Sequence, residues 1–235
     1  MRRQDVFDCR DASPIFEELF VSDPGSPPPP PPLPPPLGSS GMPGYPVVLD
    51  FEHADEIARW RPLVNWLLVI PQFFIVYLLG LVERVLGFLS LILVLFTRRI
   101  PDSIFNFRVM VYRYQWRVTT FAFFMREEYP PFSFEMRASD DGIDAASFSV
   151  EPPGEMNRWL PLVKWFLAIP HYVVLVFLGI AVFFVWIYTF FVVIITGRYP
   201  RGVRDFVVGV SRWVYRVTVY VLFMTDDYPP FSLSA

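Results

Sequence analysis

A gapless internal repeat is the feature that most limits how this chain can fold. The segment "RWRPLVNWLLVIP", which begins at Arg59, matches "RWLPLVKWFLAIP", which begins at Arg158, at an offset of 99 residues. The same offset aligns residues 129–133 with residues 228–232, and both read Tyr-Pro-Pro-Phe-Ser after an acidic pair. Such a match indicates a tandem duplication, so it predicts two copies of one structural unit with elements of equal length.

The repeat divides the chain into four parts. Residues 1–46 are predicted to be a disordered, proline-rich N-terminal region, and residues 134–145 an acidic linker. Residues 47–133 and 146–235 are the first and second repeats. The tract "PPPPPPLPPPL", from Pro27, is typical of polyproline II, which serves as a spacer or as the ligand of an aromatic-lined groove. We expect a spacer, with binding of a soluble partner as the alternative.

The composition favours a membrane protein. Hydrophobic residues make up 54% of the chain and aromatic residues 18%, and the mean hydropathy is +0.40. The excess lies in two apolar blocks, residues 63–96 and 162–195. The first twenty residues contain no apolar core, so no signal peptide is predicted, and the internal blocks must drive insertion. The formal net charge of −3 does not favour a nucleic-acid partner.

Each apolar block is long for one membrane span. About 34 helical residues reach about 51 Å, whereas a hydrocarbon core is about 30 Å thick. We therefore expect a tight hairpin of two short helices in each block, with one long bent helix as the alternative. Glu83 and Arg84 are expected to form a polar turn between the two helices of the first hairpin. Glu83 as an intramembrane proton relay is the other interpretation, although Val182 replaces it in the second copy.

Arginines recur after each apolar block at spacings close to whole helical turns. An arginine in the middle of a membrane costs about 2.5–3.5 kcal/mol on insertion scales, so we expect an interfacial helix in the headgroup layer. The alternative is a third spanning helix whose arginines face the interior of the bundle. The candidate residues for binding anionic lipid or a protein partner are Arg113, Arg117, Arg204, Arg212 and Arg216.

Loop charges predict the orientation of the chain. The basic loops at residues 98–101 and 197–204 are expected to be cytoplasmic by the positive-inside bias. With two spans in each copy, the protein would be a multi-pass protein of the cell membrane with both termini in the cytoplasm. Both copies would then share one orientation, related by a pseudo-twofold axis along the membrane normal.

Short strands are expected outside the membrane. Residues 47–52 alternate between apolar and polar, which is typical of a half-buried strand, and the corresponding stretch near Phe148 is expected to pair with it. The two prolines of Tyr-Pro-Pro-Phe-Ser cannot continue a helix, so the motif is expected to stop the interfacial helix and to release a further extended strand. The acidic pairs before the motif are expected to be solvated.

The order of four motifs resembles a known family. R-W-x-P-L-V-x-W, I-P-[QH], T-x-R-x-P and Y-P-P-F-S follow one another in each copy, and this order resembles the bacterial membrane family described as domain of unknown function 4389. The resemblance covers residues 47–232, and the first copy departs from the pattern at "TRRIPDSIFNF". It implies a bacterial, actinobacterial integral membrane protein, and it brings no catalytic residues.

Motifs for catalysis are not apparent. The sequence has no Gly-rich phosphate loop, no metal-spaced Cys/His cluster and no G-x-S-x-G, so no enzyme activity, metal or cofactor is predicted. His171 aligns with Gln72 in the first copy and is expected to be a hydrogen-bonded residue at a helix end.

Two functions are consistent with this pattern. The first is a non-catalytic scaffold or accessory subunit that contacts membrane lipids and protein partners in a larger membrane complex. The alternative is a small transporter or channel built from two parallel repeats. The predicted fold is mainly α and integral to the membrane: a tandem duplication of a helical hairpin plus an interfacial helix, with short β-strands in a small extramembrane sheet.

Overall fold

A computed structural model describes residues 45–52, 56–140, 142 and 144–234 of the chain. The chain divides into two units, Met1–Leu37 and Gly38–Ala235, and every described residue belongs to the second. Apart from residues 45 and 46, the predicted proline-rich region therefore lies outside the described residues.

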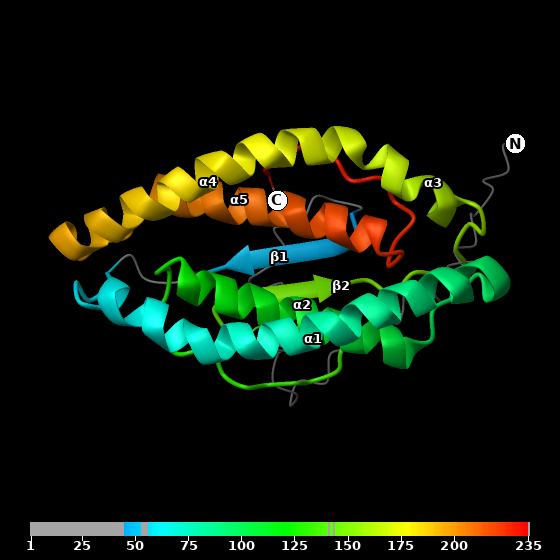
Figure 1. The fold of residues 1–235 in the computed structure, drawn as a ribbon, viewed down its shortest axis with the longest axis horizontal. Helices are drawn as coiled ribbons and strands as arrows, with labels where there is room; N and C mark the ends of the chain where they lie inside the picture. Colours follow the sequence, from blue (N-terminus) through cyan, green and yellow to red (C-terminus); the bar gives the residue numbers. More distant parts are fainter. Residues whose placement is uncertain (1–44, 53–55, 141, 143, 235) are drawn as a thin grey trace, which may run out of the picture. The chain divides into compact units, whose positions relative to one another are not determined.

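The two copies contain the same elements in the same order (Figure 1). A strand is followed by a long apolar helix and then by a second helix. The elements are β1 (Val47–Phe51), α1 (Arg61–Thr97), α2 (Asp102–Ala122), β2 (Ala146–Val150), α3 (Leu160–Leu167), α4 (Ile169–Thr196) and α5 (Arg201–Val221). The long helix of the second copy has a short break at Ala168, which separates α3 from α4.

The predicted helical hairpins are wrong, and the alternative of one long helix in each block is correct. α1 continues without interruption for 37 residues, and α3 with α4 covers the same length. Glu83 and Arg84 lie inside α1 rather than in a turn. A turn is not required there because the Glu83 carboxylate receives hydrogen bonds from the side chains of Arg108 and Tyr112 on α2, so it needs no contact with water.

The long helices end in the same way. Arg98 and Gly197, which the repeat aligns, both adopt the left-handed conformation, and each donates its backbone N–H to the carbonyl four residues earlier. Glycine suits this conformation because it has no Cβ. Pro101 and Pro200 then immediately precede α2 and α5. The chain thus turns sharply, and each second helix packs back along its long helix.

The predicted pairing of the two opening strands is confirmed. β1 and β2 form an antiparallel two-stranded sheet in which Leu49 lies opposite Phe148. Alternate residues of each strand are buried, as the period-two pattern predicts. The further strands expected after Tyr-Pro-Pro-Phe-Ser are not found among the described residues of segments 132–140 and 231–234.

The two copies are related by a pseudo-twofold axis perpendicular to the long helices. The N–H of Ile57, before α1, donates to the carbonyl of Gly197, after α4, at 3.0 Å. The N–H of Met156, before α3, donates to the carbonyl of Arg98, after α1, at 2.9 Å. Each long helix therefore begins where the other ends, and the two run in opposite directions (Figure 1).

The second helices lie between the long helices and the sheet. α2 packs against α1 and β2, and α5 packs against α4 and β1. An aromatic cluster fills the centre, where the Tyr215 ring contacts Tyr112, Trp116 and Phe148 at centroid separations of 5.2–6.3 Å. The core is thus built from both copies, so neither copy has a complete core alone.

Candidate functional site: an exposed apolar surface above a buried polar network

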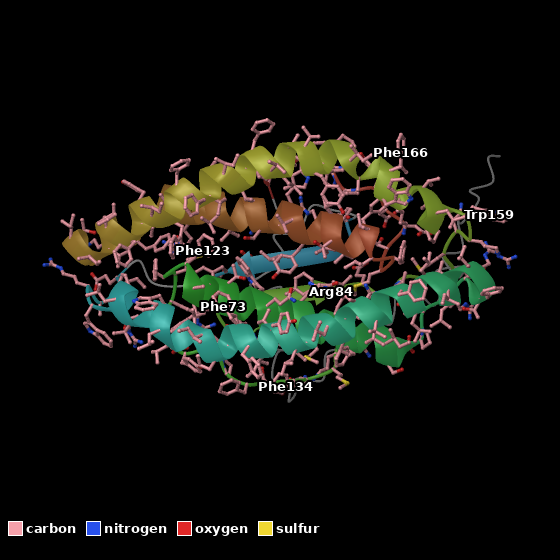
Figure 2. The ribbon with its side chains drawn as sticks, viewed as in Figure 1. Phe73, Arg84, Phe123, Phe134, Trp159 and Phe166 are labelled. Atoms are coloured by element: carbon pink, nitrogen blue, oxygen red, sulfur yellow. The ribbon has the colours of Figure 1, made fainter. Side chains whose placement is uncertain are left out.

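The long helices expose apolar side chains that the protein does not cover. Only 22% of the most apolar window of α1 and 11% of that of α3–α4 is buried. Phe73 on α1 is 51% exposed and Phe177 on α4 is 69% exposed, and aromatic side chains also project from α3 (Figure 2). Both stretches are long and apolar enough to cross a membrane. An exposed apolar surface of this extent is typical of contact with lipid or protein.

The arginines of α2 are buried instead of facing outward. Arg113 donates to the carbonyls of Phe148 at 3.1 Å and Ser139 at 2.8 Å, and it forms an ion pair with Asp140 at 3.0 Å. Arg117 donates to the Ser133 hydroxyl at 2.6 Å and also pairs with Asp140, at 3.4 Å. Two of the predicted site residues thus bind the linker and the segment before it to α2. These two guanidinium groups therefore face the linker and β2.

The arginines of α5 have corresponding roles in the second copy. Arg212 donates to the Leu49 carbonyl at 2.7 Å and pairs with Asp50 at 2.9 Å. Arg216 donates to the Ser234 carbonyl at 3.0 Å, and burial lowers the pKa of its guanidinium. Arg204 is half-buried in the first turns of α5. Binding of lipid or a partner by these five arginines stays a prediction, but four of them hold the two copies and their extended segments together.

In each acidic pair before Tyr-Pro-Pro-Phe-Ser, the first residue accepts a hydrogen bond from the chain just before a long helix. Glu127 accepts the Ala58 N–H at 2.5 Å, and Asp226 accepts the Asn157 N–H at 2.6 Å. Asp226 also accepts a hydrogen bond from Lys164, whose side chain is completely buried, at 2.7 Å. The prediction that both members of each acidic pair are solvated is therefore wrong for the first member. Both N–H groups lie two residues before the N-cap residues Trp60 and Trp159, so the carboxylates hold the chain that leads into each long helix.

The Tyr-Pro-Pro-Phe segments then pack against the long helices. In the first copy, Gln72 donates to the Pro130 carbonyl at 3.1 Å and accepts a hydrogen bond from Tyr114. In the second copy, the Nδ1 atom of His171 accepts the indole N–H of Trp213 at 3.0 Å, and Phe231 stacks on the imidazole with centroids 3.9 Å apart. His171 is thus hydrogen-bonded, as predicted, and the motif is a packing segment as well as a helix stop.

The buried ion pair between Glu83 and Arg108 has no counterpart in the second copy. Glu83 accepts hydrogen bonds from Arg108 at 3.0 Å and from the Tyr112 hydroxyl at 2.6 Å, and Arg108 also donates to Ser90 at 3.2 Å. Burial, with a smaller contribution from the Glu83 charge, raises the pKa of Tyr112 well above its ordinary value. Val182 and Val207 stand at the positions of Glu83 and Arg108 in the second copy. Glu83 is therefore not a turn residue, and a role as a relay stays a prediction.

Each end of the long helices carries a cavity with arginines on its wall. One cavity, of about 660 Å³, is lined by Arg59, Arg198 and Glu127 among others. The other, of about 550 Å³, is lined by Arg98, Arg158 and Asp226 among others. The repeat aligns most of these residues, so the pseudo-twofold axis exchanges the two ends. Within the described residues, no group of three or more His, Cys, Asp or Glu side chains is placed to hold a metal ion.

Local sequence patterns did not indicate several of these ion pairs. Asp140 and Asp144 belong to the predicted acidic linker, and Asp144 pairs with Arg126 at 2.6 Å. The available signal was a charge balance: the second helices are rich in arginine, and an acidic pair follows each of them in the sequence. Which acidic residue pairs with which arginine depends on the path by which the chain crosses the sheet.

These features define a class of protein: a duplicated, mainly helical fold that buries several ion pairs and exposes the apolar faces of two long helices. The family model described as "Domain of unknown function (DUF4389)" matches residues 59–133 and 159–232, which together exceed half of the chain. The chain therefore belongs to this family and contains two copies of its domain. Comparison with curated proteins and with solved structures gave no match.

Proposed function

We propose that the protein is a non-catalytic membrane scaffold or accessory subunit, held in lipid by α1 and by α3–α4. The observation that carries the proposal is the exposed apolar surface of these helices, of which Phe74 and Phe177 are more than 60% exposed. Burying such a side chain contributes about 1.5–3 kcal/mol, so lipid contact at many positions gives a large gain. The predicted bacterial origin and a larger membrane complex belong to the same proposal.

The positions of the ionisable groups support a structural role. Glu83, Arg108, Arg113 and Lys164 are buried, and each is engaged with another part of this chain. Groups paired in this way stabilise a particular packing arrangement.

The arginines at the ends of the long helices are exposed and accessible to the headgroups of anionic lipids. Arg59 and Arg158 are exposed beside Trp60 and Trp159, which precede α1 and α3 and are 55% and 69% exposed. Tryptophan and arginine together are typical of the headgroup layer. We propose these two arginines as lipid contacts, while lipid binding by the five arginines named from the sequence stays a prediction. A soluble partner for the proline-rich region stays a prediction.

The transporter alternative would need a polar route along the long helices. The buried polar groups of α1 do not favour it, because Glu83 and Ser90 are bonded to Arg108. Ion or solute flux through vesicles that contain the purified protein would support this alternative over the scaffold.

Membrane extraction tests the proposal. The full chain should remain in the membrane fraction after washes with high salt and with alkaline carbonate, which release peripheral proteins. A Phe73→Glu, Phe177→Glu double variant should be released more readily, since each charge opposes burial in lipid by about 2.5–3.5 kcal/mol. A matched control, Ser103→Glu with Gly202→Glu, adds the same charge at exposed positions of α2 and α5 and should behave as the unmodified chain does. Release of the unmodified chain by salt alone would overturn the proposal.

A further inference from the structure

We propose that α1 and α3–α4 lie flat in one leaflet, parallel to the plane of the bilayer, with the sheet and the linker on the water side. This inference rests on the proposed membrane function and specifies the surface that contacts lipid. It places both ends of the long helices at the same depth, in the headgroup layer, instead of on opposite faces of the membrane.

The lengths of the helices favour this placement. α1 and α3–α4 each cover 37 residues, or about 55 Å at 1.5 Å per residue, against a hydrocarbon core of about 30 Å. To span this core each helix would have to tilt strongly or extend far into water with apolar residues. Apolar side chains continue along nearly the whole of both helices, as Leu63 and Phe96 near the two ends of α1 show. A helix that lies in the plane has no such mismatch.

Charged residues at the middle of the molecule oppose a spanning arrangement. Leu49 and Phe148 mark the centre of the sheet, and Arg113 connects the Phe148 carbonyl to the carbonyls of Arg137 and Ser139 in the linker. The linker therefore crosses the middle of the molecule.

The crossing segment exposes charged side chains next to the apolar side chains of Phe134 and Met136. The side chains of Glu135 and Arg137 are 59% and 48% exposed and form an ion pair at 2.6 Å. The outer face of the sheet adds Asp50 with Arg212, at 2.9 Å. If the long helices spanned the membrane, these groups would lie near the middle of the hydrocarbon, where charges are costly. Flat helices place them in water, because α2 and α5 separate the sheet from the long helices.

The symmetry of the two ends agrees with the flat placement. One end presents Arg59 and Arg198, and the other presents Arg98, Arg158 and Trp159. A spanning protein would place one of these basic ends on each side of the membrane, against the usual one-sided bias of arginine. A pseudo-twofold axis along the membrane normal places both at a single interface.

Counting labels on single molecules tests the placement. Full-length protein with Cys9→Ser and two new cysteines, Arg59→Cys and Arg98→Cys, is reconstituted in vesicles of phosphatidylethanolamine and phosphatidylglycerol. An impermeant, high-mass maleimide is then added to the outside, and the tags on each chain are counted as gel shifts. The two cysteines lie at opposite ends of α1. The control pair, Arg59→Cys with Arg198→Cys, lies at one end, on the wall of one cavity.

Flat helices predict that each chain with the Arg59→Cys, Arg98→Cys pair carries two tags or none, whichever way the molecules face. Spanning helices predict one tag on every chain, and that result would overturn the inference. The control pair should give two tags or none in either case, and detergent should expose both cysteines of both pairs. Failure of the protein to float with the vesicles would overturn both the proposed membrane function and this inference. A single tag on a floating protein would overturn only the inference.

Discussion

Leu49 and Phe148 occupy the same position in the two copies of the repeat and lie directly opposite each other in the antiparallel sheet. Because the two residues are 99 apart, as are all matched positions, the pseudo-twofold axis passes between them. The strands therefore join the two copies at their symmetry axis, and each copy supplies half of the sheet. This arrangement explains why the duplication retains equal element lengths.

The register of the sheet can be tested with a crosslink. Val48 and Ser149 lie opposite each other on the half-exposed face, where facing Cβ atoms are about 4.5–5.5 Å apart. In a Cys9→Ser background, Val48→Cys with Ser149→Cys should react with a short thiol crosslinker to give a linked monomer on gels after proteolysis. Each single-cysteine variant should give none. A product found only between chains would contradict the intramolecular sheet.

Loss of the Asp226 carboxylate should destabilise the protein more than loss of the Glu127 carboxylate, because Asp226 pairs with the buried Lys164. Removing one member of a buried ion pair leaves an unpaired charge, which costs about 3 kcal/mol or more, whereas a lost hydrogen bond costs about 1 kcal/mol. Asp226→Ala should therefore lower the free energy of unfolding in detergent more than Glu127→Ala does.

The first copy supplies the control for this comparison. Asn65 stands there at the position of Lys164, so Lys164→Asn should restore much of the stability that Asp226→Ala removes. Unfolding followed by circular dichroism would provide the values. Equal losses for Asp226→Ala and Glu127→Ala would show that the Lys164 charge is satisfied elsewhere.

The ion pair between Glu83 and Arg108 should be replaceable by the residues of the second copy. Glu83→Val alone should cost about 3–5 kcal/mol, because it leaves the Arg108 guanidinium buried without its carboxylate. The double variant, Glu83→Val with Arg108→Val, reproduces Val182 and Val207 and should recover most of that loss. Thermal unfolding of the single and double variants measures the coupling. A double variant whose loss equals the sum of the losses of Glu83→Val and Arg108→Val would show that the two side chains act independently.

The C-terminal segment should be displaced by a single methyl group. A Cβ added to Gly209, on α5, would come within 2.9 Å of the Leu233 carbonyl oxygen. Gly209→Ala should therefore cost about 1–3 kcal/mol and should hasten digestion of the C-terminus by carboxypeptidase, since Arg216 would lose its bond to Ser234. Gly179→Ala is the control, because its Cβ meets nothing within 4 Å. Unchanged digestion of the Gly209→Ala variant would contradict close packing here.

Several elements could be predicted from local patterns. The repeat implied two units of the same design, and alternation in residues 47–52 indicated the strand that forms β1. The apolar blocks corresponded to the long helices, and Arg98 and Gly197 end them ahead of Pro101 and Pro200. These features depend on backbone propensity and periodicity, which act over a few residues.

The sequence by itself therefore determined the duplication, the order of the elements and the apolar character of the long helices. Only the tertiary structure decided that neither block turns back as a hairpin and that four arginines of α2 and α5 bind other parts of the chain. Helix α1 needs no turn at Glu83 because Arg108, 25 residues away, supplies the partner that water would otherwise provide. Arg212 pairs with Asp50, which lies 162 residues earlier in the sequence. A buried charge is stable only beside its partner, and which residue becomes that partner is set by how distant segments pack.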